Sequence, residues 1–102
     1  MTVPFLTVTR RDVVEALRRV YDPELGINIV DLGLVYGVEE EEGRVQVTMT
    51  LTTPGCPVGQ SILDGVGYVL SSLPGVTDIA IRVVWDPPWN PGMIAQEIRR
   101  GL

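Results

Sequence analysis

The sequence contains no histidine, no lysine and a single cysteine, Cys56, among its 102 residues. Without histidine the chain cannot form a Ser-His-Asp or Cys-His catalytic group or a histidine-ligated zinc site. One cysteine excludes an internal disulfide, a redox C-x-x-C motif and a complete four-cysteine cage, and an unpaired thiol suits a reducing compartment. No glycine-rich nucleotide-binding or phosphate-binding motif opens a helix. These absences argue against an enzyme.

Long apolar runs and positive charge are also scarce. No apolar run reaches the roughly 18 residues of a membrane span, and the first residues, followed by Arg10 and Arg11, do not match a signal peptide. The 13 acidic side chains outnumber the 8 basic ones, for a net charge of −5. Such a chain lacks the clustered cationic face that nucleic acids require. We expect a cytoplasmic protein that binds neither nucleic acid nor membranes.

What is present is the composition of one ordinary globular domain over residues 1–102, since 45% of the residues are hydrophobic and 21% charged. Thr9 and Asp12 have the spacing of a capping box, which predicts that a helix begins there. The Asp22-Pro23 step then ends this helix. An alternating segment with its apolar positions at 45, 47, 49 and 51 predicts a strand. In full, we expect a helix up to residue 21, strands at 34–39 and 44–51, a helix at 57–73, a strand at 76–85 and a short helix ending at 101. This α-β-β-α-β-α order predicts an α+β two-layer sandwich with the helices on one face of the sheet.

Cys56 is the first candidate functional residue. Pro57 suits the first position of a helix, which places Cys56 at the N-cap, beside unpaired backbone N–H groups. That environment favours a thiolate, which can bind metal or attack an electrophile. Two alternatives stay open at this point: an inert, half-buried cysteine, or an anion bound at the helix start.

Three carboxylates, Asp22, Glu24 and Asp31, lie in the irregular segment between the first helix and the first strand. They could accept backbone hydrogen bonds, bind a hard cation, or complete a metal site near Cys56. Spacing alone favours loop capping.

Trp85 and Trp89 surround a proline-rich turn. Aromatic anchors dominate the energetics of protein interfaces, so the pair could form a partner-binding patch. The alternative is that Trp85 closes the core and Trp89 covers it.

Together these segments resemble a known family. Three motifs occur in the order seen in the SufT/PaaD-like iron–sulfur assembly factors. The first is Asp22-Pro-Glu-Leu with Asn28-Ile-Val-Asp-Leu-Gly-Leu-Val-Tyr36, the second is Thr52-Thr-Pro-Gly-Cys-Pro57, and the third is Asp86-Pro-Pro-Trp-Asn-Pro91. The third motif departs from many relatives at Asn90 and Gly92. The chain also lacks the additional C-terminal cysteines of the PaaD branch, so it is most similar to the short SufT-like type.

The resemblance implies the iron–sulfur cluster assembly fold, related to the C-terminal domain of NifU, and a non-catalytic accessory role. It implies that Cys56 is a ligand for iron or an iron–sulfur cluster, bound transiently, and that the partners are client apoproteins or other assembly proteins. A homodimer would supply two thiolates. The functional motif carried over comprises Asp22, Glu24, Asp31, Thr52, Thr53 and Cys56. The alternative is an assembly subunit of a metal-dependent multicomponent enzyme that uses the Trp85 and Trp89 region and binds no cluster itself.

Overall fold

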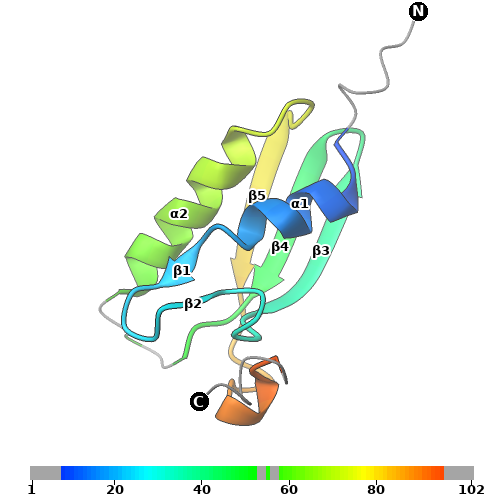
Figure 1. The fold of residues 1–102 in the computed structure, drawn as a ribbon. Helices are drawn as coiled ribbons and strands as arrows, with labels where there is room; N and C mark the ends of the chain where they lie inside the picture. The colour runs from blue at the N-terminus through cyan, green and yellow to red at the C-terminus, as the bar shows by residue number, and fades with distance from the viewer. Residues whose placement is uncertain (1–7, 53–54, 56–57, 96–102) are drawn as a thin grey trace, which may run out of the picture.

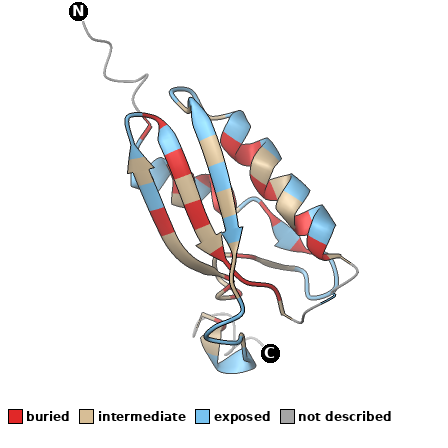
Figure 2. Cartoon of the chain, turned by 180° about the vertical axis from the view of Figure 1, so that it is seen from behind, coloured by how far each residue is buried: buried red, intermediate tan, exposed pale blue. Residues whose placement is uncertain are grey.

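The computed structural model describes residues 8–52, 55 and 58–95. A three-stranded sheet with the order β3-β4-β5 carries both helices on one face (Figure 1). Strand β3 (Val35–Glu41) runs antiparallel to β4 (Arg44–Met49), and β5 (Asp78–Val83) runs parallel to β4 after the crossover helix α2 (Gly59–Ser71). Viewed from behind, the sheet lies in front of α1 (Arg10–Leu17) and α2, and no helix or strand of the described residues covers its other face (Figure 2). The predicted α+β two-layer sandwich is confirmed.

Helix α1 begins as predicted but ends earlier. The Thr9 hydroxyl accepts a hydrogen bond from the backbone N–H of Asp12 (3.1 Å), and the Asp12 carboxylate accepts one from the backbone N–H of Thr9 (3.0 Å). The prediction that the helix runs to Tyr21 is wrong, because Tyr21–Asp22 is a short strand, β1, and Tyr21 is 57% exposed. Proline at 23 disfavours a helical Asp22, and β1 pairs instead with β2 (Ile27–Asn28).

The β3–β4 hairpin is tighter than the sequence suggests. Its turn consists of Glu42 and Gly43, both with positive φ (52° and 86°), which suits the twist of a two-residue hairpin connection. Strand β3 therefore continues to Glu41. The predicted alternation in β4 is confirmed, since Val45, Val47 and Met49 are all buried.

The core lies between the sheet and the two helices. Gly65 of α2 packs closely, because a Cβ there would lie 3.2 Å from Val20 Cγ1, whereas a Cβ at Gly67 would meet nothing within 4 Å. Of these two glycines, Gly65 is the one that allows a close approach within the described structure. The buried apolar residues are Val8, Val13, Ala16, Leu17, Val20, Ile29, Leu32, Leu34, Val38, Val45, Val47, Met49, Leu51, Ile62, Val66, Val69, Leu70 and Ile94.

After β5 the chain forms an irregular segment, residues 84–95, that contains a single 3₁₀ turn, η2 (Pro91–Met93). The Asn90 side chain accepts a hydrogen bond from Gly92 N–H (2.8 Å) at the start of this turn. The expected final helix does not include Ile94, whose backbone is extended. Its remaining positions, 97–101, lie outside the described residues. Neither α-helix in the described part of the chain has the length and hydropathy of a membrane span.

Candidate functional site

Three sequence motifs meet at one end of the sheet, where β4 and β5 both end (Figure 1). Backbone hydrogen bonds join Thr50, just after β4, to Leu34 (2.8 Å), and Val84, just after β5, to Met49 (2.8 Å). The indole N–H of Trp89 donates to the carbonyl oxygen of Leu32 (2.7 Å). The segment between β1 and β3, the end of β4 and the segment after β5 therefore form one continuous region.

Asp22 shapes the turn between β1 and β2. Its side chain is buried, and its Oδ1 accepts hydrogen bonds from the backbone N–H groups of Glu24 (2.8 Å) and Leu25 (3.1 Å). The backbone N–H of Gly26 donates to the Asp22 carbonyl oxygen (2.8 Å). Glu24 itself is exposed on this turn. Asp22 thus acts as a loop cap in this structure.

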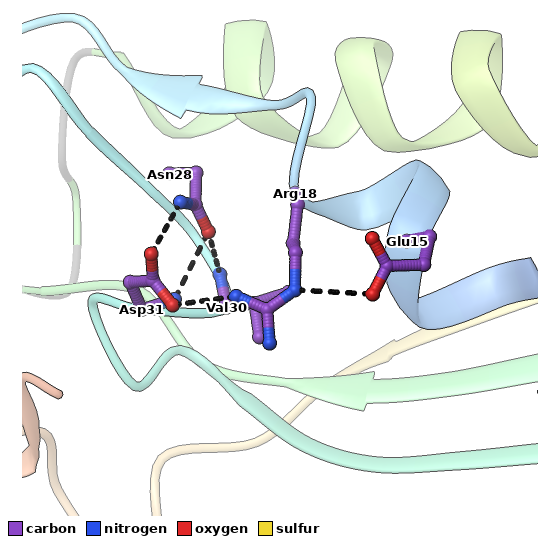
Figure 3. Close-up of polar contacts among 5 residues, drawn as sticks. All are labelled: Glu15, Arg18, Asn28, Val30 and Asp31. Atoms are coloured by element: carbon purple, nitrogen blue, oxygen red, sulfur yellow. Dashed lines mark hydrogen bonds and ion pairs between the residues drawn. The ribbon is translucent and has the colours of Figure 1, made fainter. Parts of the chain in front are cut away.

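Asp31 is the centre of a polar network that ties the motif segment to α1 (Figure 3). Its Oδ1 pairs with Arg18 Nη1 (2.6 Å), and its Oδ2 accepts from the Asn28 side-chain amide (2.8 Å). Asn28 Oδ1 in turn accepts the backbone N–H groups of Val30 (3.1 Å) and Asp31 (3.0 Å), while Arg18 Nε lies 3.5 Å from Glu15. Both carboxylate oxygens of Asp31 are thereby engaged within the chain.

Sequence reasoning missed two members of this network. Asn28 had a local signal, since an asparagine three residues before Asp31 fits a side-chain-capped turn. Arg18 had none, because it lies 13 residues away on α1 and meets Asp31 only through the tertiary fold.

The segment after β5 is fastened to the motif region at several points. The Tyr36 hydroxyl donates to the Pro87 carbonyl oxygen (2.6 Å), and Ala95 N–H donates to the Asp31 carbonyl oxygen (2.6 Å). Trp89 is partly buried against the core, whereas Trp85 is 44% exposed. The alternative in which Trp85 closes the core is therefore wrong, because β5 ends at Val83, before the alternation reaches Trp85.

The second motif is only partly described. Thr52 is partly buried, and Thr53, Cys56 and Pro57 lie outside the described residues. Helix α2 begins at Gly59 with Val58 as its N-cap, and no side chain among the described residues caps it. The N-cap is therefore two positions later than the predicted Cys56, since the Val58 carbonyl oxygen accepts the first helical hydrogen bond, from Ile62 N–H.

The donor set tests what the chain can hold. Among the described residues no group of three or more His, Cys, Asp or Glu side chains is placed to hold a metal ion. Iron–sulfur clusters are usually held by four thiolates, and the whole chain offers one cysteine and no histidine. One copy of the chain therefore cannot supply the four thiolates of such a cluster.

Comparison with known proteins finds relatives whose names refer to the assembly or maturation of iron–sulfur proteins. Residues 10–83 match the family described as "Iron-sulfur cluster assembly protein". The chain is 50% identical over 84 residues to the Fe-S protein maturation auxiliary factor SufT of Staphylococcus aureus, covering 81% of this chain and 96% of that protein. It is 48% identical over 82 residues to the Fe-S protein maturation auxiliary factor YitW of Bacillus subtilis, covering 79% and 80%.

The fold agrees with a solved structure. A crystal structure of a domain of unknown function from Bacillus anthracis matches with a TM-score of 0.84 at 40% identity, covering 91% of this chain and 92% of that one. The family match includes the acidic segment and the whole Cys56 motif, and extends through β5. The chain belongs to the iron–sulfur cluster assembly protein family and has the SufT-like type of sequence.

Proposed function

We propose that this protein is a non-catalytic accessory factor in the assembly of iron–sulfur clusters or in their transfer to client proteins. The observation that carries the proposal is the family match over residues 10–83. In addition, the chain is 48% and 50% identical to two proteins named as maturation auxiliary factors. The absence of histidine and of a second cysteine supports a role without substrate turnover.

Within this role, Cys56 is the ligand for iron or a cluster as cargo, because a thiolate is the usual protein ligand of iron–sulfur clusters and the chain has only this one. Asp22 and Asp31 hold the neighbouring loop in shape, as their hydrogen bonds support. Glu24, Thr52 and Thr53 complete the functional motif. Cargo held by so few ligands is bound transiently, with the remaining positions filled by a client.

The proposed setting is the cytoplasm, where a free thiol stays reduced. The proposed partners are client apoproteins and other assembly proteins, which bind at the Trp85 and Trp89 region. Trp85 supports this assignment because it is 44% exposed and follows the end of β5 by two residues, at the end of the sheet where the motif segments meet. We further propose that the protein is a homodimer.

Deleting the protein from its host tests the accessory role. We expect the specific activity of cluster-dependent enzymes to fall while the amount of each enzyme polypeptide stays unchanged, because polypeptide synthesis does not depend on cluster delivery. The measurements are activity and iron content per mole of purified client, with and without a plasmid carrying the wild-type gene. Clients with full iron content in the deletion strain would contradict the proposal.

A second candidate function, an assembly subunit that recruits clients without handling a cluster, is favoured by the exposure of Trp85. In that case the purified protein takes up no iron on anaerobic incubation with iron and sulfide, yet it still restores client activity. Uptake of iron would exclude this candidate.

Trp85→Ala is expected to weaken client capture about tenfold or more while leaving the fold intact, because aromatic anchors at interfaces are commonly hot spots. Trp89 is the poorer probe, since its indole N–H holds Leu32 and its loss would disturb the fold. Tyr68→Ala is the matched control: Tyr68 is another exposed aromatic (74%), on α2 rather than beside the motif loops. Pull-down of client with both variants provides the measurement, and equal capture by the two would remove Trp85 from the binding surface.

A further inference from the structure

The two edges of the sheet differ in how they are protected. At the β3 edge, the Arg10 guanidinium donates from Nε to the carbonyl oxygen of Val38 (2.9 Å), and the pairing of β3 with β4 is interrupted between Val35 and Gly37. Strand β5 forms the other edge and, within the described chain, pairs with β4 alone. An edge strand with free backbone N–H and C=O groups is a template for pairing with another strand, and natural proteins usually blunt or cover it.

Strand β5 lacks several of the devices that blunt an edge, although it carries two charged side chains, Asp78 and Arg82. Its sequence, Asp-Ile-Ala-Ile-Arg-Val, has no proline, glycine or lysine, and its ladder to β4 runs without a register shift. Its side chains alternate between the two faces of the sheet. Ile79, Ile81 and Val83 are partly buried and alternate with the exposed Asp78, Ala80 and Arg82. Since Ile79 and Ile81 pack against the core, the first three face the helices and the other three face the opposite side.

We infer that β5 pairs antiparallel with β5 of a second copy of the chain, about a two-fold axis at Ala80. In this register Asp78 lies opposite Arg82 of the partner subunit, and Arg82 lies opposite Asp78 of the partner subunit. The small Ala80 side chain faces its own copy at the centre, and Ile79 faces Ile81 of the partner subunit on the helix-bearing face. Oppositely charged and apolar cross-strand pairs both stabilise an antiparallel ladder.

Charge complementarity selects both the occupant and the register. The ion pairs found among the described residues involve Arg18 alone, so neither Asp78 nor Arg82 is satisfied in this way within that part of the chain. Asp78 lies beside Arg44 in the ladder without coming within ion-pair distance. Moving the two-fold axis to Ile79 or Ile81 removes both Asp–Arg pairs, so the strand is self-complementary only about Ala80.

This inference rests in part on the homodimer of the proposed function, and it specifies β5 as the surface through which the two copies associate. The two sheets would join into one across the axis, with the two β5 strands running in opposite directions. Because β4 runs parallel to β5 in each chain, Thr52 of the two copies would lie toward opposite ends of the joined sheet. The arrangement therefore does not join the two loops that follow Thr52, and each copy would present its own cargo loop to a client.

Charge reversal tests the register directly. Arg82→Asp places two like-charged pairs across the axis, and Asp78→Arg does the same with the opposite sign. We expect each single change to raise the dissociation constant of the dimer by about tenfold or more. The double variant Asp78→Arg/Arg82→Asp restores both ion pairs and should return the dissociation constant to near the wild-type value. Arg19→Asp is the matched control, because it makes the same charge change at an exposed arginine just after α1.

Sedimentation equilibrium of the full chain gives these dissociation constants. The concentrations run from micromolar to millimolar because a six-residue strand pair buries less than the about 800 Å² per partner of a standard interface. Circular dichroism melting checks that each variant is folded. A wild-type protein that stays monomeric throughout would overturn the inference, as would a dimer that is unaffected by Arg82→Asp or not restored by the double change. These results are independent of client activity in the deletion strain, so failure of the dimer and failure of the accessory role are distinguishable.

Discussion

Cys56→Ser is expected to abolish the maturation of client enzymes, so that a strain with this variant as its sole copy behaves like the deletion strain. The thermal stability of the purified variant should stay within a few degrees of wild type, since serine has nearly the same size as cysteine. The measurements are client iron content and specific activity in the cell, together with a melting curve of the purified protein.

The physical reason is the donor set of the chain. Asp22 and Asp31 use their carboxylate oxygens to hold the loops and Arg18, and no histidine is available. Iron in sulfur-bridged clusters is bound by soft thiolate ligands, which a serine hydroxyl does not replace at neutral pH. Removing this thiol therefore removes the only thiolate ligand of the chain.

A substitution at an exposed position that leaves Cys56 in place provides the control. Ser61→Ala alters an exposed position in the first turn of α2 by a similar small change in side-chain size and should support full client activity. Anaerobic incubation with iron and sulfide adds a second readout, in which wild type binds iron and Cys56→Ser does not. If Cys56→Ser supports normal client activity, Cys56 is not the cargo ligand, and the assembly-subunit alternative replaces the carrier role.

Local sequence signals were sufficient to predict most of the helices and strands of the fold. The capping box at Thr9 and Asp12 and the alternation in β4 each depend on residues a few positions apart, and each is confirmed. The end of α1 was predicted wrongly because Val20 and Tyr21 continue the helical spacing of apolar residues. The chain instead leaves the helix after Leu17, since Val20 accepts a hydrogen bond from Ile29 N–H (2.9 Å) beyond the β1–β2 turn.

The candidate site was predictable in its composition but not in its contacts. Asp22 and Asp31 were identified from the motif. The favoured interpretation of loop capping agrees with the backbone hydrogen bonds of Asp22, whereas the Asp31 carboxylate binds the side chains of Arg18 and Asn28. The bonds from Arg18 to Asp31 and from Trp89 to Leu32 join residues 13 and 57 positions apart. No local pattern encodes such pairs, because they form only after the helices pack and the segment after β5 folds back over the loop.

Gly33→Ala is expected to destabilise the protein far more than Gly26→Ala, although both glycines have a positive φ (86° and 68°). A left-handed backbone costs a residue with a Cβ about 1–2 kcal/mol, and this applies to both changes. At Gly26 the added Cβ meets nothing within 4 Å. At Gly33 it would lie 2.4 Å from the carbonyl oxygen of Met93 and 2.8 Å from Met93 Cβ.

The contact at Gly33 involves backbone atoms, so the neighbour cannot relieve it by a side-chain rotation. We expect the free energy of unfolding to fall by about 1–2 kcal/mol for Gly26→Ala and by about 3–4 kcal/mol for Gly33→Ala, measured by urea denaturation. Gly33→Ala should also shift tryptophan fluorescence in the native state, because Trp89 is carried by the displaced segment. Equal losses of stability would mean that the segment after β5 does not pack against the loop at Gly33.

The same pair of variants connects the fold to the site. Gly33 lies between Leu32, which binds Trp89, and Leu34, which binds the backbone after β4. Displacing residues 84–95 therefore disturbs the region where the three motifs meet, whereas Gly26→Ala alters only the β1–β2 turn. If client activity falls with Gly33→Ala at a temperature where both variants are fully folded, and not with Gly26→Ala, the segment after β5 is part of the functional surface. If both retain activity, that segment serves stability alone, and client binding must be sought elsewhere on the protein.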